Sequence, residues 1–138
     1  MPTLAEVLTL PKTIAVVGLS DKEDRPSYLV ASYLQQQGFK IIPVNPSLTE
    51  VLGEKAYPNL TAIPKDLQID IVDVFRRPET VTDIVSEILS LNIKPILWLQ
   101  EGVVAAEAKT KAEDIGLTVF MDVCLMKEHQ ALIWQGTI

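Results

Sequence analysis

The sequence predicts an α/β domain in three layers: a doubly wound, Rossmann-like parallel sheet of about five strands with helices on both faces. Short apolar runs alternate with stretches in which apolar residues recur every three or four positions. The short runs are apolar at nearly every position, which is typical of parallel strands that are covered on both faces. From the fold type we expect the strand order 3-2-1-4-5.

Five apolar runs predict the strands, at residues 13–17, 40–44, 69–74, 95–98 and 117–120. Gly38 and Gly116 each fall just after a helical stretch and just before a strand, where a left-handed residue commonly ends a helix.

Three stretches between these runs predict helices. In residues 81–89 the apolar side chains follow the i, i+3, i+4, i+7, i+8 spacing of a helix with one buried face. A second helix follows Pro26, whose ring suits a first helical turn. A third, over residues 105–115, has alanines along one face and can therefore lie close to the sheet.

Two further segments complete the chain. Thr3 and Glu6 have the spacing of a capping box, which predicts a short leading helix that ends before Pro11. Residues 46–64 lack the pattern of a crossover helix, so we expect an irregular or short helical connection there.

Length and composition predict one domain over residues 1–138, with 48% hydrophobic and 22% charged residues. The net charge of −6 argues against a general nucleic-acid or membrane-surface binder. No apolar run approaches the length of a membrane span and no secretory signal is visible, so we expect a cytoplasmic protein. A single cysteine, Cys124, and a single histidine, His129, exclude an internal disulfide and predict no metal site.

The segment after the first strand departs from a dinucleotide fingerprint. Gly18 is followed by Ser20 and Glu23 where that fingerprint needs glycines. The second strand ends in Asn45 instead of the acid that holds an NAD ribose. Two separate requirements therefore argue against NAD.

The same segment still has the outline of an anion site. Gly18 permits a tight turn, Ser20 offers a hydroxyl, and Arg25 supplies a planar cation directly before a helix N-terminus. The alternative interpretation is that Ser20 and Ser27 are turn and cap residues and that Arg25 is a solvated surface charge.

Several ordered segments carry a family resemblance over residues 4–133. They are residues 15–20 with 25–27, then 42–46, 54–60, 70–77, 98–102 and 121–124. On these segments the sequence resembles the CoA-binding domain family, specifically small stand-alone bacterial proteins related to the N-terminal domain of succinyl-CoA synthetase α subunits. Relatives often carry a basic residue at the position of Val123 and a glycine-type residue at that of Glu101, so the chain departs from the family there.

The resemblance implies a binding site for CoA along the ends of the first four strands. It places four residues around the CoA phosphates: Gly18, Ser20, Arg25 and Ser27. It places three on the 3′-phosphoribose or adenine side: Pro43, Asn45 and Pro46. Phe75 and Arg76 would flank the nucleotide, and Gln100 and Gly102 would line the pantetheine path.

The residue chemistry agrees with this carry-over. A carboxylate at the position of Asn45 would repel a phosphorylated ribose, whereas an amide does not. Arg76 follows a strand directly, where its side chain can reach a ligand; the alternative is that Arg76 and Arg77 form a salt bridge with Glu79 or Asp73. Phe75 fits core packing equally well.

No catalytic constellation emerges from the sequence. Ligase chemistry of the synthetase type needs a phosphorylated histidine in a further domain, and His129 stands at the end of a C-terminal helix. Cys124 and His129 lie five residues apart, about 140° around a helix, which favours a buried cysteine and a surface histidine. Asp70 and Asp73 fit strand ends or solvated positions.

Three functions follow as hypotheses. The first is non-catalytic binding of CoA or acyl-CoA, which we favour. The second is a CoA-dependent thiol- or acyl-exchange enzyme that uses Cys124, and the third is a sensor of another adenine nucleotide. The apolar C-terminus around Trp134 leaves a homodimer or an unidentified protein partner open.

Overall fold

The computed structural model describes residues 2–138 and has the doubly wound three-layer architecture. The strands of the main sheet are β1 (Thr13–Val17), β2 (Lys40–Val44), β5 (Ile71–Val74), β6 (Ile96–Leu99) and β7 (Val119–Met121). All neighbouring pairs in this sheet are parallel. The helices are α1 (Leu4–Val7), α2 (Pro26–Gln36), α3 (Val81–Leu91), α4 (Ala106–Asp114) and α5 (Leu125–Trp134).

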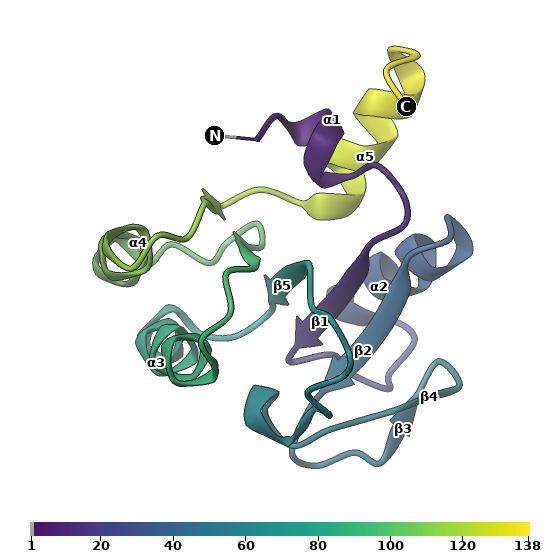
Figure 1. The fold of residues 1–138 in the computed structure, drawn as a ribbon. Helices are drawn as coiled ribbons and strands as arrows, with labels where there is room; N and C mark the ends of the chain where they lie inside the picture. The colour runs from purple at the N-terminus through teal and green to yellow at the C-terminus, as the bar shows by residue number, and fades with distance from the viewer. Residues whose placement is uncertain (1) are drawn as a thin grey trace.

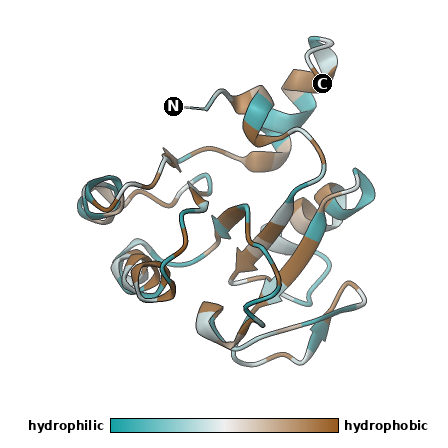
Figure 2. Ribbon diagram, in the orientation of Figure 1, coloured by the Kyte–Doolittle hydropathy of each residue, from teal (hydrophilic) through white to brown (hydrophobic). Residues whose placement is uncertain are grey.

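The helices cover the two faces of the sheet in separate groups. In Figure 1, α3 and α4 lie together on one side of the sheet, while α2 and α5 lie on the other. Successive strand residues point to opposite faces, so Ala15 and Val17 join the α3/α4 core whereas Ile14 and Val16 join the α2/α5 core. Figure 2 shows β2 brown along most of its length, as a strand buried on both faces requires.

The strand order is β2-β1-β5-β6-β7, so the expected order 3-2-1-4-5 is wrong. The third strand of the sheet, β5, pairs directly with β1 instead of lying beyond β2. The outer edge of β2 is occupied by Tyr57, whose amide donates to the Pro43 carbonyl at 3.0 Å and whose carbonyl accepts from the Asn45 amide at 2.9 Å. In the main sheet β2 is an edge strand, where Pro43, which lacks an N–H, is tolerated.

The connection from β2 to β5 has no crossover helix. It contains a hairpin of β3 (Glu50–Val51) and β4 (Glu54–Lys55), followed by the short 3-10 helix η1 (Leu60–Ala62). A second 3-10 turn, η2 (Pro78–Thr80), leads into α3. The expected irregular connection over residues 46–64 is confirmed in this form.

The leading helix and both glycine turns are as expected. Thr3 caps α1 by accepting from the Glu6 amide at 3.2 Å. Gly38 and Gly116 have φ values of +101° and +94° and end the turns before β2 and β7. No helix within residues 2–138 combines the length and apolar composition needed to cross a bilayer.

Candidate functional site

Gly18 joins the ends of three strands. Its amide donates to the Val44 carbonyl at 2.8 Å, which fastens the end of β1 to that of β2. Its φ is +90°, and a Cβ built on it would lie 2.4 Å from the carbonyl oxygen of Phe75, just after β5. Only a residue without a side chain permits this approach. The point is the topological switch of the sheet, since β1 connects towards β2 and β5 connects towards β6.

The two serines of the loop after β1 fold that loop onto α2. The hydroxyl oxygen of Ser27, which is 5% exposed, accepts from the Ser20 amide at 3.0 Å. The Ser20 hydroxyl oxygen accepts from the Lys22 amide, also at 3.0 Å. Both serines therefore hold the turn through their side-chain oxygens, while each hydroxyl hydrogen stays available to a ligand.

The N-terminus of α2 faces this loop without a side-chain cap. Arg25 is the N-cap residue, but its side chain makes no capping hydrogen bond, and Pro26 has no amide hydrogen. Helix geometry leaves the amides of Ser27 and Tyr28 without intrahelical partners. Such amides, at the positive end of an eleven-residue helix, favour an anion.

Asn45 ties the end of β2 to the same loop. Its side-chain amide donates to the Leu19 carbonyl at 3.0 Å, and its side-chain oxygen accepts from the Ser47 amide at 2.9 Å. Pro43 is buried within β2, whereas Pro46 is exposed directly after it. Asn45 thus holds the loop that carries Gly18 and Ser20.

The segment after β5 brings an aromatic ring and two cations to the switch point. Phe75 is half-buried and packs against the α2/α5 core. The Cδ of Arg76 lies 3.4 Å from the position of a Cβ on Gly18, so this side chain runs past the glycine. Neither Arg76 nor Arg77 forms an ion pair, because the only salt bridge within residues 2–138 joins Lys127 and Glu101. The alternative pairing with Glu79 or Asp73 is not formed.

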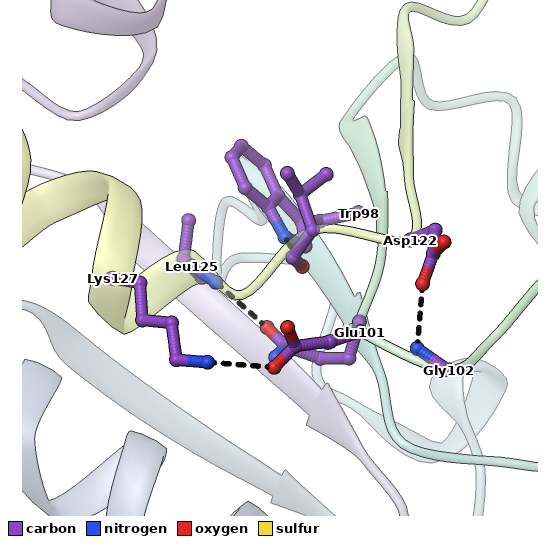
Figure 3. A network of polar contacts seen from close by, with 8 residues as sticks. Trp98, Glu101, Gly102, Asp122, Leu125 and Lys127 are labelled. Atoms are coloured by element: carbon purple, nitrogen blue, oxygen red, sulfur yellow. Dashed lines mark hydrogen bonds and ion pairs between the residues drawn. The ribbon is translucent and has the colours of Figure 1, made fainter.

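A polar network fixes the ends of β6 and β7 (Figure 3). The side-chain oxygen of Gln100 accepts from the Leu125 amide at 3.1 Å, so this buried glutamine caps α5. The Gly102 amide donates to a carboxylate oxygen of Asp122 at 2.8 Å. Lys127 pairs with Glu101 at 3.0 Å, which raises the pKa of the lysine.

The structure therefore gathers the sequence-predicted site residues at one edge of the sheet, but in two groups. Six of them stand in the loops after β1, β2 and β5 or at the start of α2: Ser20, Arg25, Ser27, Asn45, Phe75 and Arg76. Gln100 and Gly102 follow β6, the next strand along, and contact the start of α5 and the loop after β7.

A model of the CoA binding domain matches residues 12–130. The chain belongs to this family. It is 44% identical over 126 residues to the uncharacterized protein YneT of Bacillus subtilis, and the match covers 91% of each chain. A solved structure of a hypothetical protein from Pyrococcus horikoshii superposes with a TM-score of 0.87 at 37% identity, covering 94% of this chain and 89% of that one.

The same domain occurs within larger enzymes. An ADP-forming acetate–CoA ligase of Archaeoglobus fulgidus is 32% identical over 97 residues, which is 69% of this chain but 14% of the ligase. This CoA-binding domain protein therefore corresponds to one part of such ligases.

Sequence reasoning misplaced two buried polar side chains of this CoA-binding domain. Asp73 is not at a strand end or solvated: it lies within β5 with 0% exposure, and neither carboxylate oxygen has a hydrogen-bond partner within residues 2–138. Burial raises the pKa of Asp73 well above its usual value. The signal was its position inside an apolar run, where strand alternation puts it on a covered face.

His129 is the second correction, since it is 4% exposed and not on the surface. Its Nδ1 lies 2.7 Å from the hydroxyl oxygen of Tyr33 on α2, and burial lowers the pKa of His129. Cys124 is buried and free, as expected, and stands directly before α5.

A groove of about 550 Å³ lies at the opposite edge of the sheet, between the segment before β5 and the end of α3. Leu60, Ile63 and Leu91 are among the residues that line it. None of the sequence-predicted site residues contributes to it, so the groove and the candidate site are separate.

Proposed function

We propose that this protein binds CoA or acyl-CoA without catalysing a reaction, and that the phosphates lie against the loop after β1. One observation carries the proposal. The chain has three arginines, and all three (Arg25, Arg76 and Arg77) stand in the two loops that meet at the contact between Gly18 and Phe75. Arginine is the side chain best suited to phosphate, because its planar fork donates two parallel hydrogen bonds.

The donors around Gly18 fit a pyrophosphate. The uncapped amides at the start of α2 and the hydroxyl hydrogens of Ser20 and Ser27 would face it. Gly18 keeps the centre of the loop free of a side chain. The overall charge of −6 makes these local donors necessary, since the rest of the molecule repels an anion.

The remaining residues would hold the rest of the ligand. Pro43, Asn45 and Pro46 would lie on the 3′-phosphoribose or adenine side, with Phe75 beside the nucleotide. At Asn45 a neutral amide does not repel a phosphorylated ribose, whereas a carboxylate would. Gln100 and Gly102 would line the path of the pantetheine arm.

Thiol chemistry at Cys124 finds little support. Nδ1 of the His129 ring is hydrogen-bonded to the Tyr33 hydroxyl on α2 and not to Cys124. Cys124 is 8% exposed and packs with the α2/α5 core. A Cys124→Ser variant should therefore bind CoA like the wild type, and any turnover that this variant abolished would favour an enzyme instead.

Thermal unfolding with CoA, acetyl-CoA, dephospho-CoA, NAD or ATP tests the binding function. Ligand at about 100 times its Kd stabilises by about 2.7 kcal/mol, which raises the Tm of a domain of this size by roughly 5–10 °C. We expect such a rise with CoA, and a smaller one with dephospho-CoA.

The matched variants are Arg25→Ala and Lys65→Ala, each of which removes one exposed cation. Lys65 lines the groove at the far edge of the sheet. Arg25→Ala should reduce the CoA shift and Lys65→Ala should not. The absence of any shift with CoA would contradict the proposal, and equal shifts with ATP and CoA would favour a sensor of adenine nucleotides.

A further inference from the structure

Asp73 occupies the centre of the sheet on the face covered by α2 and α5. It pairs in register with Val16 of β1 and Trp98 of β6, both of which are fully buried. Neither neighbour offers it a hydrogen bond: valine is apolar, and the indole N–H of Trp98 donates to the Val123 carbonyl at 2.8 Å.

Asp73 differs in this respect from the other buried polar side chains. Within residues 2–138 these are Ser27, Gln100 and His129, and each has a partner. Burying a carboxyl group without a hydrogen bond strongly opposes folding. Its in-register neighbours are an apolar side chain and an indole that is already paired, so neither accounts for an acid at this place.

Its position links Asp73 to the switch point. Strand alternation puts Ile71, Asp73 and Phe75 on the same face, with Phe75 towards the carboxyl edge. Phe75 is only half-buried, and its carbonyl is the group that Gly18 approaches. On this face of β5, Phe75 is therefore the next residue from Asp73 towards the proposed ligand.

Burial raises the pKa of Asp73 well above its usual value, which favours the neutral acid. A neutral carboxyl group has one O–H donor, which an ionised one lacks. It also carries no charge that would repel a phosphate.

We propose that Asp73 is a ligand-binding residue: when Phe75 turns aside, the neutral acid donates a hydrogen bond to a carbonyl or phosphate oxygen of the bound CoA-type ligand. This inference rests on the proposed function, because it names a further contact at the same site. The ligand chemistry it predicts is an oxygen acceptor, and it excludes an ammonium group or a metal ion at this point.

The inference is tested by calorimetric titration with CoA, which measures the Kd of the wild type and of the variants Asp73→Asn and Asp73→Val. Asparagine keeps a neutral donor of similar shape, so its Kd should stay within about threefold of the wild type. Valine removes the donor, and its Kd should rise by about tenfold, the size of one neutral hydrogen bond. Valine should also raise the Tm, because it removes the unpaired polar group.

Asp70→Asn is the matched control, because Asp70 precedes the same strand at the opposite edge of the sheet and accepts from the Thr13 amide. It should leave the affinity for CoA unchanged. If Asp73→Val fails to fold, Asp73→Ala replaces it.

The outcomes separate the two proposals. Unchanged CoA binding by Asp73→Val would overturn the inference and indicate a carboxyl group that only meets interior water. If Asp73→Asn also lost binding, the proposal that a neutral hydrogen-bond donor acts at this position would be wrong. A wild-type protein that fails to bind CoA would remove the proposed function, and this inference with it.

Discussion

Gly18 is the residue on which the geometry of the switch point depends. With φ at +90° and the Phe75 carbonyl oxygen 2.4 Å from the site of a Cβ, alanine there brings both backbone strain and a clash with backbone. We expect Gly18→Ala to lower the free energy of unfolding by about 2–4 kcal/mol, from strain and overpacking together. Urea unfolding measures this directly.

Gly102 provides the matched control, because it has the same φ of +90° but nothing within 4 Å of its Cβ position. Gly102→Ala should therefore lower the unfolding free energy by strain alone, about 1 kcal/mol. Equal effects at the two glycines would mean that the close approach between the loops after β1 and β5 is absent in solution.

At the same scale, the sequence predicted the glycine, hydroxyl and arginine chemistry of the loop after β1 but not how each atom is used. Ser20 and Ser27 bond to backbone amides within the loop, and the amide of Asn45 holds the Leu19 carbonyl. These partners come from the folded path of the loop, which residue types do not specify. The expectation for Asp73 is wrong because an acidic residue in a sequence normally indicates a solvent-exposed position.

Helices α2 and α5 are joined by a pair that responds to pH. The Tyr33 hydroxyl and Nδ1 of His129 share a hydrogen bond of 2.7 Å, and the rings of Tyr33 and Phe39 stand edge-on to the histidine. Burial lowers the pKa of His129 below its usual 6.5. Below about pH 6.5 the unfolded state therefore binds more protons at this residue than the folded state does. The unfolding free energy then drops by up to about 1.4 kcal/mol for each pH unit.

The comparison variant is His129→Gln, which keeps a neutral polar side chain that does not titrate. The stability of the wild type relative to this variant should decline from pH 7 to pH 5. A constant difference over that range would show that His129 titrates alike in the folded and unfolded states.

At the scale of elements, the sequence predicted the strands of the main sheet and helices α1 to α4 with small shifts at the ends. It placed His129 at the end of the C-terminal helix, whereas α5 continues to Trp134. It did not predict the hairpin, because Leu52 and Gly53 form its turn with φ values of +55° and +76°. Asparagine or aspartate is the usual residue before glycine in such a turn, and leucine gives no signal. The expected strand order is wrong although Pro43, which lacks an N–H, favours an edge position for β2.

For the whole molecule, the distribution of charge matters more than its sum. The body is acidic, yet its arginines stand only after β1 and β5. A parallel sheet puts these two loops at one edge, and the order β2-β1-β5 makes them neighbours. The corrected strand order thus brings together the cations that the expected order would have separated by one strand.

The pH dependence of global stability combines two buried groups that act in opposite directions. Below pH 3.8 Asp73 is protonated in both states and its burial has no ionic penalty. As pH rises, the unfolded state releases this proton first, so stability falls by up to about 1.4 kcal/mol per unit until the raised pKa of the folded state is reached. His129 has the opposite slope below about pH 6.5, so the two partly cancel in the wild type.

The variant Asp73→Asn in a His129→Gln background separates the contributions of Asp73 and His129 to the pH dependence of stability. Urea unfolding between pH 4 and pH 7 should show the single variant His129→Gln gaining stability, relative to the double variant, as pH falls towards 4. The difference isolates Asp73, because every other carboxyl group is common to both chains. Parallel curves would mean that Asp73 is ionised alike in the folded and unfolded states, and hence that water or a cation reaches the centre of the sheet.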